Sequence, residues 1–429
     1  MDIKIISAVC AAAFAGCAAV TGSTERCAFK PLFDGKSLDG WTVKGGSAGF
    51  SVEDGAIVGR GVPDTYGNTF LCTEKEYANF ILKLEYKIDS GNSGVQFRSA
   101  ERPAAEYRHG NEIYGYQAEI TLDGENASRI YDEARRGHKY GIVWLDASTP
   151  AERLETAKAS FRPGDWNELE IQCVGPSVKT WLNGNKVADI FDDASERGFI
   201  GLQVHCGPEC VVRWRNVRIR ELDDSPAWKK FFVKGAGGEP KVEGAHYILP
   251  ECWTFEKNDS DGEYLKGFHP AGIEEDGLVI SDLDYGNFVA RVSYNINGGN
   301  SALYFRSAEE NIPWVLKGFQ NEIAGNSRDS ALWHTQGETT PGRGWIAWND
   351  ELVEKVRKPG GWNTITTIAV ADRIVDRING FETFDIVDPE CEKTGKLGLQ
   401  LHGGIEVVMK FKDWEMMPVP DWMLPYIAR

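Results

Sequence analysis

Apolar and polar residues alternate over short stretches through most of the chain. Runs such as 80–88, 169–174 and 211–222 place an apolar side chain at every second position, which is the period of a strand with one buried face. Clusters of Gly, Asn, Asp and Pro separate these runs, and the Asn-Gly pairs at 183–184 and 379–380 are typical of tight hairpin turns. Helical periodicity is scarce. We therefore predict an all-β chain built from antiparallel sheets packed face to face.

Four sequence blocks occur twice in the same order, and each second block lies between 196 and 208 residues after the first. A period of that size is much longer than a solenoid repeat, so each copy is expected to be a whole domain. We predict a first domain over 29–222, a polar linker marked by Gly and Pro over 223–240, and a second domain over 241–429. The paired blocks are NSGVQFRSA (92–100) and NSALYFRSA (300–308), YGYQAEI (114–120) and KGFQNEI (317–323), WNELEI to VADI (166–190) and WNTITT to TFDI (362–386), and GFIGLQVHCG (198–207) and GKLGLQLHGG (395–404).

The alternation also sorts side chains by face. In the first copy it places Arg98, the pair Gln117 and Glu119, and the pair Gln203 and His205 opposite the apolar residues of three strands. A solvated sheet face would explain any one of them. Their recurrence favours a polar site in each domain, and the second copy repeats the set as Arg306, Gln320, Glu322, Gln400 and His402.

The first residues resemble an export signal. An apolar run over 5–15 follows Lys4, and residues 14–17 (FAGC) are similar to the lipobox of bacterial lipoproteins. We expect a leader over 1–22, with Cys17 lipidated and the protein held in the periplasm or at the outer membrane of a Gram-negative bacterium. Ordinary cleavage near 18–22, which would release a free periplasmic protein, is the alternative. No later stretch is apolar enough to span a membrane.

The net charge and the composition limit the kinds of partner that this protein is expected to bind. The net charge of −17 disfavours nucleic acid and anionic membranes, whereas 14 Trp and 14 Tyr suit sugar ligands. A disulfide between Cys206 and Cys210 is possible across a turn. No Cys or His spacing fits zinc, and the acidic loop 259–263 could hold calcium but matches no fixed loop pattern. No cofactor or metal is predicted.

A family resemblance adds a fold and an activity. LFDGKSLDGW (32–41), NSGVQFRSA, GYQAEI, IYDEARRG (130–137), WNELEI, LNG and GLQVHCG with RNVRI resemble the 3-keto-disaccharide hydrolase domain family. This family has a concanavalin A-like jelly roll, so the resemblance implies two tandem jelly-roll sandwiches. The second copy lacks a clear LFDGKSLDGW opening and has SALWHTQGE (330–338) in place of IYDEARRG. Catalysis is therefore expected in the first copy.

The resemblance implies cleavage of glycosides that carry a ketone at C3. Such a ketone acidifies the C2 proton, so a base can form an enolate that expels the C1 aglycone, and water then adds to the enone. Glu119 and His205 are the candidates for base and acid, in either order, and Arg98 and Gln117 could hold the ketone oxygen. The remaining candidates are Gln203 as a substrate contact and a charged loop that either closes the cleft or forms exposed ion pairs, made of Asp132, Glu133, Arg135 and Arg136.

Two other functions use the same fold. A retaining glucanase needs two carboxyls about 5–5.5 Å apart. Glu119 and Asp123 on one strand would be about 13 Å apart, which argues against it. A non-catalytic carbohydrate-binding protein would need aromatic platforms, for which the candidates are Trp144, Trp333, Trp345 and Trp348.

Overall fold

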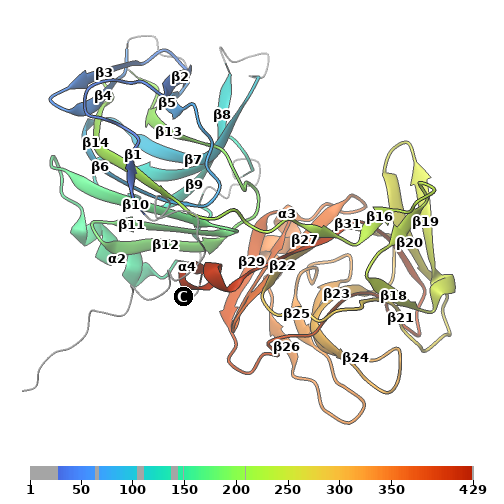
Figure 1. Ribbon diagram of the computed structural model, residues 1–429. Helices are drawn as coiled ribbons and strands as arrows, with labels where there is room; N and C mark the ends of the chain where they lie inside the picture. The colour runs from blue at the N-terminus through green and yellow to red at the C-terminus, as the bar shows by residue number, and fades with distance from the viewer. Residues whose placement is uncertain are drawn as a thin grey trace, which may run out of the picture.

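The computed structural model describes residues 28–62, 67–103, 111–136, 144–147, 149–207 and 209–427. The chain forms two β-sandwiches in succession, and each consists of two antiparallel sheets packed face to face (Figure 1). This confirms the predicted all-β fold of two tandem jelly rolls. The expected leader over 1–22, with Cys17, lies outside the described residues.

The first sandwich packs a larger sheet against a smaller one. The strand orders are β12-β11-β10-β6-β14-β4-β3, with β1 on β14, and β2-β5-β13-β7-β8-β9. The smaller sheet carries three of the repeated blocks. The strands are β1 (Lys30–Pro31), β2 (Trp41–Gly45), β3 (Gly49–Glu53), β4 (Ala56–Arg60), β5 (Thr69–Thr73), β6 (Phe80–Ser90), β7 (Ser93–Arg102), β8 (Glu112–Ile120), β9 (Ile130–Glu133), β10 (Asn167–Val174), β11 (Ser177–Leu182), β12 (Asn185–Phe191), β13 (Phe199–Val204) and β14 (Val211–Glu221).

The second sandwich repeats this arrangement. Its larger sheet has the order β19-β20-β31-β22-β27-β28-β29, with β15 on β31, and its other sheet has the order β18-β21-β30-β23-β24-β25-β26. Strands β16 and β17 form a separate hairpin. The strands are β15 (Lys229–Lys230), β16 (Phe232–Lys234), β17 (Pro240–Val242), β18 (Ala245–Ile248), β19 (Trp253–Asn258), β20 (Gly262–His269), β21 (Gly277–Ser281), β22 (Phe288–Ile296), β23 (Ser301–Glu309), β24 (Leu316–Ile323), β25 (Leu332–His334), β26 (Gly344–Ala347), β27 (Asn363–Val370), β28 (Arg373–Ile378), β29 (Phe381–Val387), β30 (Lys396–Leu401) and β31 (Val407–Pro418).

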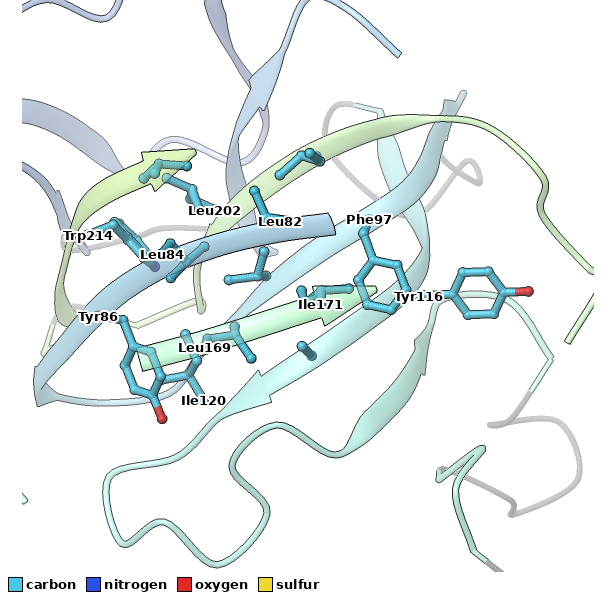
Figure 2. Close-up of a cluster of buried hydrophobic side chains, with 14 of the residues drawn as sticks. Leu82, Leu84, Tyr86, Phe97, Tyr116, Ile120, Leu169, Ile171, Leu202 and Trp214 are labelled. Atoms are coloured by element: carbon cyan, nitrogen blue, oxygen red, sulfur yellow. The ribbon is translucent and has the colours of Figure 1, made fainter. Parts of the chain in front are cut away.

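Each sandwich has its own hydrophobic core between its two sheets. In the first core, Leu82 of the larger sheet lies near Phe97 and Tyr116 of the smaller sheet (Figure 2). The rings of Phe97 and Tyr116 stack with centroids 5.5 Å apart, and Phe305 and Phe319 repeat this contact at 5.4 Å in the second core. The repeated blocks therefore supply equivalent core contacts in both copies.

Both predicted Asn-Gly turns are hairpin turns. They join β11 to β12 and β28 to β29, and all four residues have positive φ: 48° and 81° at Asn183 and Gly184, and 53° and 82° at Asn379 and Gly380. This is the backbone of a type I′ turn, which Asn and Gly adopt with little strain.

The helices of the described residues are short, and they lie between strands or after the last strand. The described residues contain no helix that is long and apolar enough to cross a membrane. The alternation of apolar and polar residues did not predict these helices, because they are short and do not form a layer of either sandwich. They are α2 (Ala151–Ser160), η1 (Pro250–Cys252), α3 (Asp350–Val356), η2 (Asp421–Met423) and α4 (Leu424–Ile427).

The segment expected to be a linker, 223–240, is in part packed onto the second sandwich. Strand β15 pairs with β31, and Phe231 is completely buried with its ring stacked on Trp414 at a centroid distance of 4.1 Å. The polar and glycine-rich composition of this segment hid the aromatic side chains that anchor it, which include Phe232 beside Phe231.

The two sandwiches also contact one another. Val174 and Phe191 of the first share a hydrophobic cluster with Val289 and Val375 of the second and with residues of the C-terminal segment. Helix α4 lies beside β12 (Figure 1), and the Gln172 side-chain amide donates a hydrogen bond to the Tyr426 carbonyl at 2.8 Å. The C-terminal segment thus returns to the first copy.

Ion pairs border this contact. Arg373 of β28 lies 3.0 Å from Asp189 of β12, and Arg377 of the same strand lies 2.7 Å from the completely buried Asp192. Burial alone would raise the pKa of Asp192, but Arg136 and Arg377 lower it well below its ordinary value. The aspartate is therefore held ionised at the interface.

Candidate functional site

A row of polar side chains lies on the smaller sheet of the first sandwich, opposite the core. The Gln96 amide of β7 donates to Gln117 Oε1 at 3.1 Å, and the Gln117 amide donates to Glu119 Oε2 at 2.9 Å. Gln117 also reaches Gln203 Oε1 of β13 at 3.4 Å. Three of the predicted residues, Gln117, Glu119 and Gln203, are therefore brought together, as their alternation along the strands predicts.

Glu119 is the acidic centre of this row. Its side chain is 8% exposed, and Asn92 donates a hydrogen bond to Glu119 Oε1 at 2.7 Å. Burial raises the pKa of Glu119, while the hydrogen bonds from Asn92 and Gln117 and the nearby His205 oppose the rise. A buried carboxyl with a raised pKa is a candidate for proton transfer in a reaction.

His205 lies just beyond the end of β13 and is partly exposed. Its Nδ1 lies 3.0 Å from the Cys206 carbonyl oxygen, which fits an Nδ1–H donor and leaves Nε2 available to another group. The influence of His205 on Glu119 is electrostatic. The structure thus places the predicted acid and base candidates near one another.

Two neighbours were missed by the sequence analysis. Asn68, before β5, accepts a hydrogen bond from the Cys206 backbone N–H at 3.1 Å and donates to Glu133 Oε1 at 3.2 Å. Tyr131 lies directly opposite Gln117 in the β8–β9 register, and burial, with Glu133 and Glu119 nearby, raises its pKa to about 12. Glu133 therefore belongs to the side of the sheet that carries Glu119. The alternation on β9, which places Tyr131 on the same face as Glu133, was the signal available for Tyr131.

Arg98 does not lie on this polar face, so its predicted role in substrate binding is wrong. The register of β7 against β8 shifts between Phe97 and Ala100, and Arg98 has a φ of 46°. Its guanidinium is buried and donates to the carbonyls of Ala78 at 2.8 Å and Gly175 at 2.7 Å. A β-bulge breaks the period of two and turns the side chain toward the interior.

Arg306 corrects the prediction for the second copy in the same way. It has the same φ of 46° and donates to the carbonyls of Gly286 at 3.0 Å and Ala371 at 2.8 Å. The duplicated arginine therefore ties strand ends together in both sandwiches and is a structural residue.

The charged loop is not a lid over the site. Asp132 is 1% exposed and pairs with Arg135 at 2.5 Å and Arg136 at 3.0 Å, and Arg136 also pairs with Asp192. Asp132, Arg135 and Arg136 therefore join the ion pairs near the second sandwich. Alternation on β9 sends Asp132 to the face opposite Tyr131 and Glu133.

The disulfide that the sequence made possible is not formed, and Cys206 and Cys210 are both free thiols. Cys206 is exposed, whereas Cys210 is buried and its Sγ contacts the Asn92 carbonyl at 3.2 Å. The turn between them leaves the two side chains in different environments.

The acidic loop 259–263 forms structural contacts. Asp261 pairs with Lys410 at 2.7 Å and accepts a hydrogen bond from Trp362 Nε1 at 2.9 Å. The described part of the chain contains no group of three or more His, Cys, Asp or Glu residues that could hold a metal ion.

The second sandwich has the same polar centre. Asn300 and the Gln320 amide, at 3.0 Å, donate to the two carboxylate oxygens of Glu322, which is 7% exposed, and burial raises the pKa of Glu322. Its neighbours His402 and Gln400 occupy the positions of His205 and Gln203. The predicted set without Arg306 is therefore assembled around Glu322.

A cavity of about 840 Å³ opens over this second centre. Asp276 at its wall accepts hydrogen bonds from the Gln400 amide and the Gly403 backbone N–H, each at 2.7 Å. Its size and its mixture of aromatic and polar groups are typical of small-molecule sites. The lining includes Asn300, Gln320, Glu322, Gln400, His402, Tyr304, Trp314, Trp333 and Trp345.

Several known proteins are similar to about half of this chain. A "3-keto-disaccharide hydrolase" of Bacteroides thetaiotaomicron is 24% identical over 237 residues, which cover 45% of this chain and 78% of that protein. A Parabacteroides distasonis crystal structure, titled as a candidate glycosyl hydrolase, is 25% identical, covers 47% of this chain and 98% of its own, and has a TM-score of 0.32. The carbohydrate-binding module CBM66 of Bacillus subtilis is 18% identical. The match covers 42% of this chain and 96% of that module, with a TM-score of 0.27.

The family of 3-keto-alpha-glucoside-1,2-lyase-like domains matches two separate segments, residues 28–220 and 240–417. Together the two segments span most of the chain. The chain therefore belongs to this family and contains two copies of its domain.

Proposed function

We propose that the chain cleaves 3-keto glycosides, with Glu119 and His205 of the first copy as its acid and base. The observation that carries the proposal is the buried Glu119 carboxyl. It accepts hydrogen bonds from the side-chain amides of Asn92 and Gln117 and lies near the His205 imidazole. The name of the Bacteroides relative and the family match support this substrate class.

In the proposed reaction, Glu119 takes the C2 proton of the 3-keto sugar and an enolate forms. The C1–O bond then breaks, the leaving group departs as an alcohol after His205 gives it a proton, and an enone remains. Water adds its oxygen to C1 and a proton returns to C2. The net reaction is hydrolysis of the glycosidic bond, with no oxidant or reductant consumed.

A donor is needed for the enolate oxygen, since Arg98 is buried elsewhere. Gln203 Nε2 is buried and has no hydrogen-bond partner among the described residues, while its Oε1 accepts from Gln117. We assign Gln203 to the ketone oxygen, because a preorganised amide donor stabilises charge that develops there in the transition state. Gln117 then holds both Glu119 and Gln203 in position.

Turnover in heavy water tests the mechanism. Elimination followed by hydration places deuterium at C2 of the product, whereas direct displacement at C1 leaves the C2 proton in place. The unoxidised parent glycoside serves as the control, because it lacks the ketone that acidifies C2 and should not be cleaved. Product without deuterium at C2 would refute the elimination pathway.

Separate substitutions Glu119→Gln and His205→Asn distinguish catalysis from binding alone. If the first copy is catalytic, the variants lose the turnover that this copy contributes but still bind the 3-keto sugar. A non-catalytic binding protein would show no turnover in the unsubstituted chain either.

A further inference from the structure

The second copy was expected to be inactive because it has SALWHTQGE where the first has IYDEARRG. The structure removes that reason. In the first copy, Asp132 of this segment is buried and pairs with the partly buried Arg136, which also pairs with Asp192 at the contact between the sandwiches. Losing these side chains from the second copy leaves the groups around Glu322 intact.

The base and the acid of the proposed reaction both have counterparts in the second copy, whereas the amide of Gln400, the counterpart of Gln203, donates to Asp276 and Tyr304. Glu322 is held by Asn300 and Gln320 as Glu119 is held by Asn92 and Gln117. His402 Nδ1 lies 2.7 Å from the Gly403 carbonyl oxygen, as His205 Nδ1 lies near that of Cys206. The imidazoles of His205 and His402 therefore have the same orientation relative to the following backbone carbonyl.

The surroundings of the two carboxyls differ at three positions. The strand registers place Trp333 opposite Gln320 where Tyr131 lies opposite Gln117. In the first copy Gln96 contacts Gln117, whereas in the second Tyr304 contacts Gln400 at 3.2 Å. Asp276 accepts a hydrogen bond from the Gly403 backbone N–H, and in the first copy Asn68 accepts the equivalent hydrogen bond from the Cys206 backbone N–H.

Tryptophans give the second cavity an aromatic wall. Trp333 and Trp345 are in edge contact with ring centroids 4.8 Å apart, and both line the cavity with Trp314. Trp345 is 41% exposed, and the Arg328 guanidinium lies 5.2 Å from its ring centroid, so the exposed part of the ring is what a ligand can reach. Indole faces stack on the C–H face of a sugar ring, and a cavity of about 840 Å³ is large enough for two rings.

We propose that the second copy is a second catalytic site, which cleaves 3-keto disaccharides with the leaving sugar stacked on Trp333 and Trp345. This inference rests on the proposed function of the first copy. Glu322 removes the C2 proton, the C1–O bond breaks, His402 protonates the departing sugar, and water adds across C1 and C2. Gln400 and Asp276 are positioning residues, because they hold the segment that carries His402.

The test uses the full chain and a matched pair of substitutions. Turnover of a 3-keto disaccharide and of the methyl 3-keto glucoside is measured for the unsubstituted chain, Glu119→Gln, Glu322→Gln and the double variant. Glu354→Gln, an exposed carboxyl on α3, is the control for a charge change in the second copy. Thermal unfolding of each variant verifies that it is folded.

We expect Glu119→Gln to retain turnover of the disaccharide, and adding Glu322→Gln to lower that residual rate by about 10²- to 10⁴-fold. In the Glu119→Gln background, Trp345→Ala should raise KM for the disaccharide but not for the methyl glycoside. In the Glu322→Gln background it should change neither, which separates sugar stacking from a general structural effect.

Two results would overturn the inference, and they are distinguishable. If the unsubstituted chain cleaves the disaccharide but Glu119→Gln alone abolishes all turnover, the second copy is not catalytic and the first-copy proposal stands. If the unsubstituted chain cleaves neither substrate, the proposed function itself fails, and the second site fails with it.

Discussion

The two copies share a carboxyl centre but differ in what surrounds it. Glu119 and Glu322 are both buried, both held by an Asn and a Gln, and both near a His. Around Glu119 the neighbours are Asn68, Gln96 and Tyr131, and around Glu322 they are Asp276, Tyr304 and Trp333. Since the centre is common and the walls differ, the proposed function assigns chemistry and specificity to separate sets of residues.

The same comparison shows that recurrence has more than one cause. Arg98 and Arg306 are repeated as faithfully as the glutamates, yet both bind backbone carbonyls in the interior. A duplicated domain retains residues that its architecture needs as well as residues that its chemistry needs. Burial and hydrogen-bond partners separate the two groups.

The largest effect is expected from the carboxyl of the first copy. In the Glu322→Gln background, Glu119→Gln should lower kcat for a 3-keto glycoside by about 10²- to 10⁴-fold, the usual worth of a general acid or base. Steady-state kinetics measure it. An unchanged kcat would show that Glu119 takes no part in the reaction.

Arg377→Met should cost about 3–5 kcal/mol of stability, because it removes one partner of the buried Asp192. The two arginines lower the pKa of Asp192 below its unfolded value of 3.8, so the stability from this network is complete above that value and is lost as pH falls. Chemical unfolding at pH 7 and at acidic pH measures both effects. We expect the variant to show a weaker pH dependence, and a free energy equal to that of the parent would contradict the structural role.

Arg98→Met and Arg306→Met should each cost about 1–3 kcal/mol, since each leaves buried carbonyls without a donor. Their effect on kcat should be small in folded protein at a temperature well below the midpoint. Thermal unfolding paired with kinetics verifies this. A large loss of kcat at unchanged stability would show that Arg98 takes part in the reaction.

Exchanging the aromatic residues of the two copies should change KM for the disaccharide rather than kcat. Trp333→Tyr should raise KM for a disaccharide in the Glu119→Gln background, and Tyr131→Trp should lower it in the Glu322→Gln background. A difference of about 1 kcal/mol, or roughly fivefold, fits the worth of one aromatic contact. Equal KM values in parent and exchanged chains would show that these walls do not contact the leaving group.

The smallest effect concerns pH. Burial raises the pKa of both glutamates, so activity should fall on the acid side at a pH above their ordinary 4.5. The Asn92 and Asn300 hydrogen bonds stabilise the ionised form, so Asn92→Ala and Asn300→Ala should move this limb to higher pH in their own copies. Profiles of kcat/KM in the two single-glutamine backgrounds measure the shifts. A shift to lower pH would mean that these amides do not bond the carboxylates.

Much of the fold could be predicted because it is local or periodic. Alternation identified the strands and the side of the sheet on which Gln117, Glu119 and Gln203 lie, since a strand sends successive side chains to opposite faces. The Asn-Gly pairs marked hairpins because these residues tolerate positive φ. The repeat predicted two sandwiches, because each copy contains a complete set of strands.

The sequence by itself determined the two sandwiches and most of the carboxyl row. Only the tertiary structure decided where Arg98 points, because one residue with positive φ at a bulge reverses the alternation. It also decided that Asp132 and Arg136 belong to the contact between the copies, since Arg136 pairs both with Asp132 and with Asp192, which lies far away in the chain. The cavity over Glu322 depends on side chains from several strands and loops, whose positions no local period encodes.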